Sequence, residues 1–188
     1  TYEVFKTVSK DFNDIKIEVI DSKKNSIAEG LIVKRAIELL EQNKPYEEII
    51  DEIKLLRDKT NILVHVKTLD NMVRSGRIKK GLGRLAKIIN LKPIVSIDND
   101  GNGIVYKKSI GEKNNIRKII KYIKKIHKKN KILKYAIVHV NNIKLAEYLK
   151  VKIIEITGLK QEYITEISSV IAMNSGLGSV AVGYITEV

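Results

Sequence analysis

Short runs of β-branched residues alternate with segments of helical periodicity along most of this 188-residue chain. Apolar residues recur at helical spacing over 27–42, which predicts an amphipathic helix. Compact runs at 62–66, 135–140 and 180–185 predict strands. Because each sheet face and each helix stripe must be covered, this alternation limits the fold to a sheet packed against helices. We therefore expect an α/β or α+β protein.

The remaining predicted elements are shorter. They are helices over 1–12, 45–56, 69–73, 82–89 and 143–149, and strands over 15–19, 93–97, 104–106, 151–156 and 163–167. Ser26, followed three residues later by Glu29, fits a capping box at the start of the 27–42 helix. Residues 98–103 are expected to connect two of the strands as a hairpin loop.

Composition excludes several classes of protein. A hydrophobic fraction of 44% is sufficient to build a core, so the chain is not globally disordered. The absence of cysteine excludes disulfides, thiolate nucleophiles and cysteine metal sites. No apolar run approaches the ~20 residues that a membrane-spanning helix needs. We expect a cytoplasmic protein.

The net charge of +13 is concentrated in one segment. Residues 107–134 hold 12 lysines and arginines and the single acid Glu112, with isoleucines at helical spacing between them. This pattern predicts an amphipathic helix with a solvated cationic face. Eleven of the 12 basic residues are lysines, which bind as hydrated point charges and do not read bases by themselves. A lysine-rich surface is favoured over an acidic protein or membrane partner and over nucleic acid.

The candidate catalytic and metal-binding patterns are all incomplete. Asp98, Asp100 and Asn102 fit the start of a calcium loop, but its twelfth position is Ser109 rather than glutamate. The histidines are scattered, and those in predicted strands have no second ligand at i+2 or i+4. No nucleophile elbow or serine–histidine–aspartate order is present. The sequence therefore predicts a protein that is not an enzyme and has neither metal nor cofactor.

Two loops are candidates for ligand contact. The loop Ser175-Gly176-Leu177-Gly178-Ser179 lacks the third glycine of a nucleotide fingerprint, because that position is Ala181. It still permits either a plain turn or a close approach of the backbone to an anion. In Arg74-Ser75-Gly76-Arg77, the glycine can end the preceding helix while two guanidinium groups project from the turn. Helix capping alone is the alternative for that second loop.

Six stretches of the chain form a collinear set of motifs. They are Thr1-Tyr2, Asp21-Ser22 with Ser26 and Gly30, the helices from Gly30 to Ile53, Leu69 through Arg74-Ser75-Gly76-Arg77-Ile78, Asn90-Leu91-Lys92-Pro93-Ile94, and Met173-Asn174-Ser175-Gly176-Leu177-Gly178. In this order and spacing they resemble the DegV family of fatty-acid-binding proteins. In that family the basic turn usually reads Arg-Gly-Gly-Arg-Ile and the late loop reads His-Thr-Gly-Pro-Gly. The resemblance covers nearly the whole chain.

The resemblance implies a two-domain α/β protein that buries one long-chain fatty acid, such as palmitate, between its domains. It implies a carrier, which in some members presents the acyl carboxylate to a separate fatty acid kinase. Residues 1–58 then correspond to the remnant of an N-terminal α/β domain, and 59–188 to a C-terminal domain of sheet and helices. Such a fragment would lack the hydroxyl-bearing segment before Thr1, and we expect it to bind fatty acid weakly or not at all.

The same resemblance implies the site residues. The candidate ligands of the carboxylate end are Asn174, Ser175, Gly176 and Arg77, the candidate partner-docking residues at the tunnel mouth are Arg74 and Arg77, and the supporting motif is Asp21, Ser22 and Ser26. Asn174 stands where the family has histidine, and asparagine donates a hydrogen bond but carries no charge. The alternative is a nucleic-acid-binding or regulatory module acting through residues 107–134, which lack interleaved aromatics beyond Tyr122.

Overall fold

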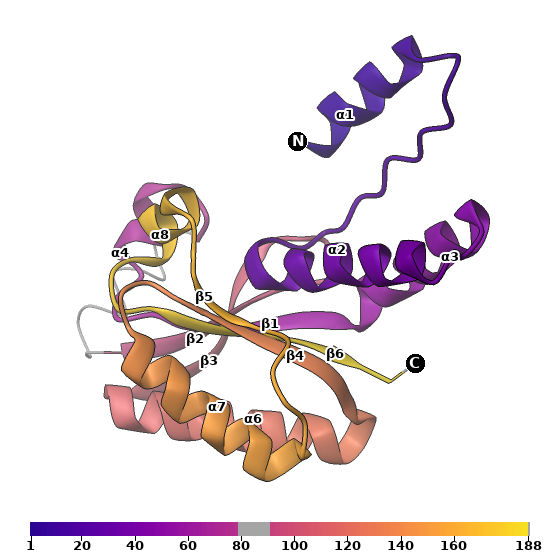
Figure 1. Ribbon diagram of the computed structural model, residues 1–188. Helices are drawn as coiled ribbons and strands as arrows, with labels where there is room; N and C mark the ends of the chain where they lie inside the picture. Colours follow the sequence, from indigo (N-terminus) through magenta and orange to yellow (C-terminus); the bar gives the residue numbers. More distant parts are fainter. Residues whose placement is uncertain (79–90, 188) are drawn as a thin grey trace.

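The computed structural model of the protein describes residues 1–78 and 91–187, so the predicted 82–89 helix lies outside the described residues. Its centre is a six-stranded sheet with helices on both faces (Figure 1). The strands are β1 (Thr60–His65), β2 (Leu91–Ile97), β3 (Gly103–Ile110), β4 (Ile132–His139), β5 (Ile164–Glu166) and β6 (Val180–Thr186). The helices are α1 (Tyr2–Val8), α2 (Ser26–Glu41), α3 (Tyr46–Lys59), α4 (Asp70–Arg74), α6 (Glu112–Asn130), α7 (Ile143–Thr157) and α8 (Ser169–Ser175). The expected α/β architecture is confirmed.

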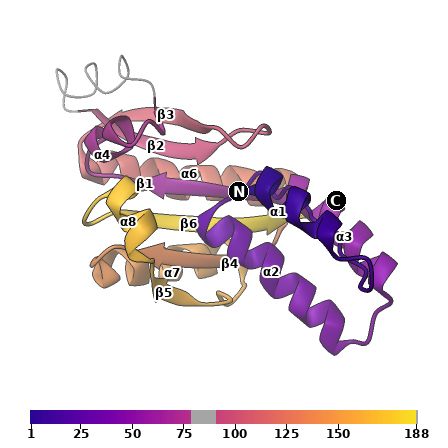
Figure 2. The ribbon, with the colours of Figure 1, turned by 90° about the horizontal axis from the view of Figure 1, so that it is seen from above.

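The strands follow the order β3-β2-β1-β6-β4-β5, which Figure 2 shows from above. The last strand, β6, lies between β1 and β4 and is antiparallel to both. Only the short β4–β5 pair is parallel among the pairs of this sheet. The C-terminal strand therefore holds the two halves of the sheet together.

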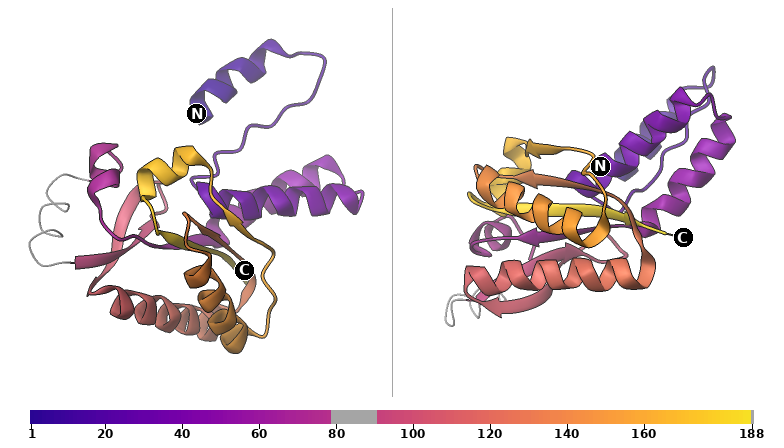
Figure 3. Two further views of the ribbon diagram at one scale, coloured as in Figure 1. Left: turned by 60° about the vertical axis from the view of Figure 1, so that its left-hand side comes forward. Right: turned by 60° about the horizontal axis from the view of Figure 1, so that its bottom comes forward.

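One face of the sheet is covered by α6 and α7, which lie side by side (Figure 3). The apolar stripe of α6 buries Ile116, Ile119 and Ile123, and α7 contributes Leu149 and Ile153 to the same cluster. Strand alternation supplies the other half of this cluster, because residues two apart point to one face. The predicted helical periodicity of both segments is explained by this contact.

The other face of the sheet is covered by α2 over β1, β4 and β6, and by α4 and α8 at one end (Figures 1 and 3). The apolar stripe of α2 buries Ile27, Ala28 and Leu31 against the strands. Helix α3 packs against α2 through a separate small cluster that includes Ile49 and Ile53. Helix α1 buries none of its residues, and Figure 1 shows it standing apart from the sheet. The division at residue 58 stays a prediction.

Three sequence predictions are wrong at the level of local structure. Residues 15–19 have no regular secondary structure and pair with no strand among the described residues, and Ile15 and Ile17 are exposed. Residues 151–156 continue α7 rather than forming a strand. The capping box is also absent: Asn25 occupies the N-cap position and neither it nor Ser26 caps the helix through its side chain. Instead Glu29 lies 3.2 Å from the hydroxyl of Ser22, which donates to it.

The basic segment 107–134 is not one helix. Its first residues belong to the edge strand β3, the helix α6 begins at Glu112, and β4 begins at Ile132. The predicted hairpin around 98–103 is confirmed, since Ile97 pairs with Gly103. The carboxylate of Asp98 accepts backbone N–H groups at 2.9 Å from both Asp100 and Asn102, which fixes the loop as a turn.

Candidate functional site

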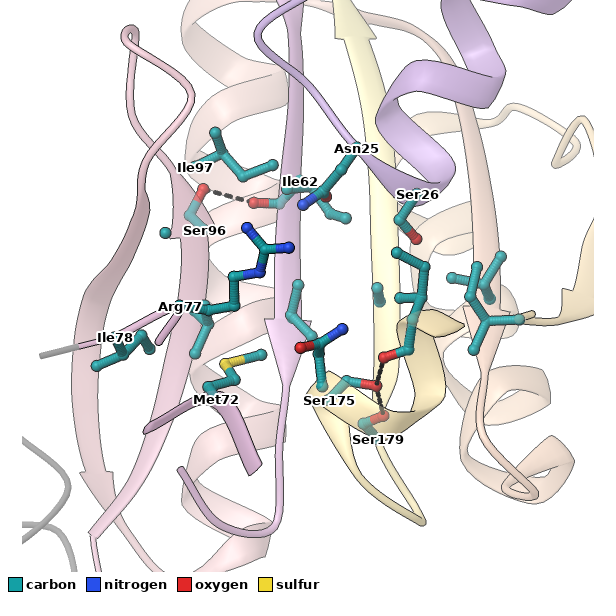
Figure 4. A pocket seen from close by; sticks show the side chains of 18 of the residues that line it. Asn25, Ser26, Ile62, Met72, Arg77, Ile78, Ser96, Ile97, Ser175 and Ser179 are labelled. Carbon is teal, nitrogen blue, oxygen red and sulfur yellow. Dashed lines mark hydrogen bonds between the residues drawn. The ribbon is translucent and has the colours of Figure 1, made fainter. Parts of the chain in front are cut away.

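A cavity of about 480 Å³ opens on the α2 face of the sheet, between the start of α2, the α4 turn and α8 (Figure 4). This volume lies within the roughly 300–1,000 Å³ of small-molecule sites. Its lining residues come from six separate parts of the chain. They are 24–26, Ile62, Val64, Met72, 76–78, 95–97, 101–103, 138–140, Ile167, Val170, Ile171, Asn174, Ser175, Ser179 and Ala181.

The floor of the cavity is a continuous apolar row across four strands. Val95 of β2 pairs with Val64 of β1, Val64 pairs with Ala181 of β6, and Ala181 pairs with Val138 of β4. Directly paired residues point to the same face, so these four side chains line up side by side. The small Ala181 in the middle of the row leaves room above the sheet. The floor is therefore suited to an apolar ligand.

One wall of the cavity is the end of α4 and the basic turn after it. Gly76 adopts a left-handed conformation with φ +71°, and its N–H donates to the carbonyl of Val73. The N–H of Arg77 donates to the carbonyl of Met72 at 2.8 Å, which completes a Schellman termination. This confirms the predicted turn and its glycine cap. The same turn also directs the chain at Arg77 back over the sheet.

The two arginines of this turn have different surroundings. The Arg77 side chain points into the cavity in Figure 4, and among the described residues it makes no hydrogen bond or ion pair. Arg74 does not line the cavity, and its Nη2 donates to the Oδ1 of Asn71 at 2.7 Å. The prediction placed both residues at one tunnel mouth. In the structure Arg77 lines the cavity, whereas Arg74 contacts another residue of α4.

The α8 end of the cavity holds the other predicted site residues. Asn174 and Ser175 line the cavity, but the amide Nδ2 of Asn174 already donates to the carbonyl of Val170 at 2.8 Å. The hydroxyls of Ser175 and Ser179 lie 2.9 Å apart, as Figure 4 shows. Gly176 does not line the cavity. A Cβ there would lie 2.5 Å from the Nδ2 of Asn71, so the glycine allows α8 to approach α4.

The Asp21-Ser22-Ser26 motif lies at the loop that enters α2. Asp21 and Ser22 stabilise the loop locally: the Oδ1 of Asp21 accepts the N–H of Lys23, and the Oγ of Ser22 accepts the N–H of Lys24. Only Ser26 of the three lines the cavity, with a backbone φ of +53°. The structure therefore brings Ser26, Arg77, Asn174 and Ser175 to one cavity, while Asp21 and Ser22 shape its approach.

Several polar cavity residues were not singled out as site residues from the sequence. Ser96 donates its hydroxyl to the carbonyl of Ile62 at 2.6 Å, and His139 accepts the N–H of Asn142 at its Nδ1. Asn25 lies beside Ser26 at the rim. Strand alternation places the side chain of Ser96 on the face opposite to Val95 and Ile97, so the sequence pattern does not identify Ser96 as a cavity residue.

The electrostatic character of the cavity is cationic. Among the residues that the structure describes, its lining contains Lys24 and Arg77 but no aspartate or glutamate. Burial lowers the pKa of the Lys24 ammonium, which the nearby carboxylate of Asp58 partly offsets. Within the described ranges no group of three or more histidine, aspartate or glutamate side chains is placed to hold a metal ion. An apolar floor with a cationic rim fits an amphiphilic anion.

The fold and the cavity define an α/β protein with an apolar, cation-rimmed cavity on one face of a largely antiparallel sheet. The sequence pattern of the DegV family, described as uncharacterised proteins, matches residues 1–187. The chain belongs to the DegV family.

Known proteins agree with this assignment. A DegV domain-containing protein of Clostridium acetobutylicum is 31% identical over 183 residues, which cover 97% of this chain and 65% of the relative. A fatty acid binding DegV family protein of Streptococcus agalactiae is similar in structure, with a TM-score of 0.85 at 23% identity, over 100% of this chain and 65% of that one. The Streptococcus pneumoniae Fatty Acid Kinase (Fak) B3 protein loaded with linoleic acid is also similar, with a TM-score of 0.87 at 23% identity, over 98% of this chain and 66% of that one.

At these identities the two structures establish the fold. The chain spans slightly less than two thirds of the length of the relative and of both solved chains. No helix in the described part of the chain is long and apolar enough to cross a membrane.

Proposed function

We propose that this protein binds one long-chain fatty acid, such as palmitate, in the cavity between α2, α4 and α8. The observation that carries the proposal is the Arg77 guanidinium, whose side chain has no partner among the described residues, beside an apolar floor with no carboxylate in its described lining. Family membership supports it. The names of two similar proteins support it as well, since one is called fatty acid binding and the other is loaded with linoleic acid.

The physical chemistry of an acyl chain suits this cavity. Each methylene moved from water onto the Val95–Val64–Ala181–Val138 row gains about 0.8 kcal/mol. The carboxylate loses water at the same time, and that loss must be offset by donors or a cation. A guanidinium supplies two parallel N–H donors to a carboxylate. Ser26 and the second N–H of Asn174 are the further donors that we assign to the ligand. Ser175 lines the same end of the cavity, but its hydroxyl donates to the carbonyl of Ile171 at 3.3 Å and would have to turn to reach the ligand.

We further propose that the protein is a cytoplasmic carrier with no catalytic activity and no cofactor. Among similar proteins, one carries the name of a fatty acid kinase B3 protein, which supports presentation of the bound acid to a separate kinase. Asn174 stands in place of the family histidine and carries no charge. Binding of the acyl carboxylate in this protein therefore depends on Arg77 for positive charge. The nucleic-acid alternative has no support among the similar proteins.

The proposal is tested by titrating the 188-residue protein with palmitate in a calorimeter, beside the variants Arg77→Gln and Arg74→Gln. A lost hydrogen bond to a charged group costs about 1.5–3 kcal/mol, so Arg77→Gln should weaken binding roughly 10- to 150-fold. Arg74→Gln is the matched control and should bind as the wild type does, because Arg74 contacts Asn71 and not the cavity.

Equal losses in both variants would contradict the assignment of Arg77 as the carboxylate ligand. No binding by the wild-type chain, together with no retained acid in native mass spectrometry, would refute fatty acid binding by this chain.

A further inference from the structure

The face of α6 that points away from the sheet carries a continuous row of cations. Lys113, Arg117, Lys121, Lys124 and Lys128 follow one another every three or four residues and are all exposed. The opposite side of the helix is buried in the core, so its orientation is fixed. Because residues three and four apart are neighbours on a helix surface, these like charges lie close together and repel one another.

The cations of α6 have no acidic partners in the described part of the chain. Among the described residues, no ion pair involves a lysine or arginine of this helix. The neighbouring α7 differs, since its Lys150 and Lys152 pair with Glu147 and Glu155 of the same helix. The charge excess of α6 is therefore uncompensated within the described fold.

The edge strand β3 extends this face. Lys108 and Ile110 line a shallow basin of about 540 Å³ together with Arg117, Lys118 and Lys121 of α6, and none of its described lining residues is a carboxylate. Lys118 donates to the backbone carbonyl of Lys108 at 2.6 Å. The other cationic side chains of the basin make no such bond in the described structure. Ile110, 64% exposed, stands at its rim.

We propose that this cationic face, formed by α6 and the end of β3, docks on the surface of an anionic lipid bilayer. A bilayer presents many phosphate groups in a plane, and hydrated lysine charges bind such an array without needing fixed geometry. The exposed Ile110 beside the basin suits the boundary between headgroups and acyl chains. Nucleic acid fits less well, because the nearby aromatic rings of Tyr106 and Tyr122 contact each other edge to face, with centroids 5.4 Å apart, rather than lying open for base stacking.

Docking through α6 leaves the cavity accessible. Figures 1 and 3 show α6 on one side of the sheet and α2, α4 and α8, which surround the cavity, on the other. The bilayer and the cavity ligand therefore occupy opposite faces of the molecule. This inference does not depend on which ligand the cavity takes.

The test is co-sedimentation of the 188-residue protein with vesicles of equal parts phosphatidylglycerol and phosphatidylcholine, free of fatty acid, at low ionic strength. We expect binding to these vesicles and none to pure phosphatidylcholine. The variant Lys121→Gln/Lys124→Gln/Lys128→Gln should bind about 100-fold more weakly, since each cation near an anionic membrane contributes about a fivefold factor. The matched control, Lys6→Gln/Lys10→Gln/Lys44→Gln, removes the same charge from exposed positions on the other side of the sheet and should bind like the wild type.

Salt gives a second readout. Binding should disappear at about 1 M salt, where charges are screened beyond about 3 Å. Circular dichroism of both triple variants establishes that they are folded. The proposal is overturned if anionic vesicles do not bind, if the two variants lose affinity equally, or if a DNA duplex binds while the vesicles do not.

Discussion

His65 has no exposed surface, and its side chain joins three elements of the fold. Its Nδ1 lies 3.0 Å from the Oδ1 of Asn115 in α6, and the Nδ2 of Asn115 donates to the carbonyl of Lys92 in β2 at 2.6 Å. With this amide orientation Nδ1 carries the proton. Nε2 is 3.3 Å from the carboxylate of Glu112 but makes no hydrogen bond. The imidazole therefore connects β1 to α6 and, through Asn115, to β2.

This environment predicts a dependence of stability on pH. Burial lowers the pKa of His65 below its ordinary 6.5, although Asn115 and Glu112 act in the opposite direction. The unfolded chain then binds a proton that the folded chain does not, so the free energy of unfolding should fall as pH drops below about 6.5. The slope from one group is at most about 1.4 kcal/mol per pH unit.

Urea unfolding at a series of pH values, for wild type and His65→Gln, measures this slope. The variant should lose the part of the slope that lies just below pH 6.5. Identical slopes in both proteins would mean that His65 does not titrate on unfolding in this range.

At the scale of elements, two glycines allow α2 to lie directly on the sheet. A Cβ at Gly183 in β6 would lie 2.7 Å from the Cγ2 of Ile27 and 3.3 Å from that residue's backbone carbonyl carbon. A Cβ at Gly30 in α2 would lie 2.6 Å from the hydroxyl of Tyr163. The first contact is with packed core and backbone, and the second is with the hydroxyl at the end of a partly exposed ring.

The two positions should therefore respond differently to alanine. Gly183→Ala is expected to destabilise the protein by about 1–3 kcal/mol through overpacking. Gly30→Ala gains up to about 1 kcal/mol of helix propensity, which offsets the displacement of Tyr163. Chemical denaturation of both variants checks this ranking, and a Gly30→Ala variant as unstable as Gly183→Ala would contradict it.

Across the whole molecule, a network of charges joins α2 to distant parts of the chain. Lys134 of β4 donates to both carboxylate oxygens of Glu38 at 2.5 and 2.6 Å, although the two residues are 96 positions apart. Arg35 donates to Glu38 at 3.2 Å and to Glu52 of α3 at 2.6 Å. Burial acts to raise the pKa of Glu38, but the bonds from Lys134 and Arg35 outweigh it and hold that pKa below the ordinary 4.5.

The lowered pKa sets the sign of a prediction. Glu38 stabilises the fold above about pH 4.5, and this contribution is lost as pH falls through the folded-state pKa. Glu38→Gln should cost about 1–2 kcal/mol near neutral pH, and the difference from wild type should vanish in acid. The control Glu147→Gln breaks an exposed pair within α7 and should cost no more than about 0.5 kcal/mol. A constant difference for Glu38→Gln at every pH would exclude the charge as its origin.

The fold could be predicted where local patterns are long. The 16 residues of α2 and the 19 residues of α6 have an apolar stripe that only a helix presents to one side. The basic turn was also predictable, because Gly76 can adopt its left-handed conformation without strain. Within the site, the positions of Arg77, Asn174 and Ser175 at one cavity followed from the family resemblance, whereas their roles in binding stay predictions.

The errors occurred where a short pattern fits two structures. Residues 151–156 contain enough β-branched residues for a strand, but Ile153 follows Leu149 by one helical turn and both pack into the same core. Residues 15–19 alternate as a strand does, but a strand needs a neighbour to bond its backbone, and no strand of the described sheet lies beside them. Sequence therefore determined which segments are apolar on one side and where the chain turns. Only the tertiary structure decided which backbone groups find partners and where the helices on the α2 face leave space for the cavity, because both depend on contacts between residues far apart in the chain.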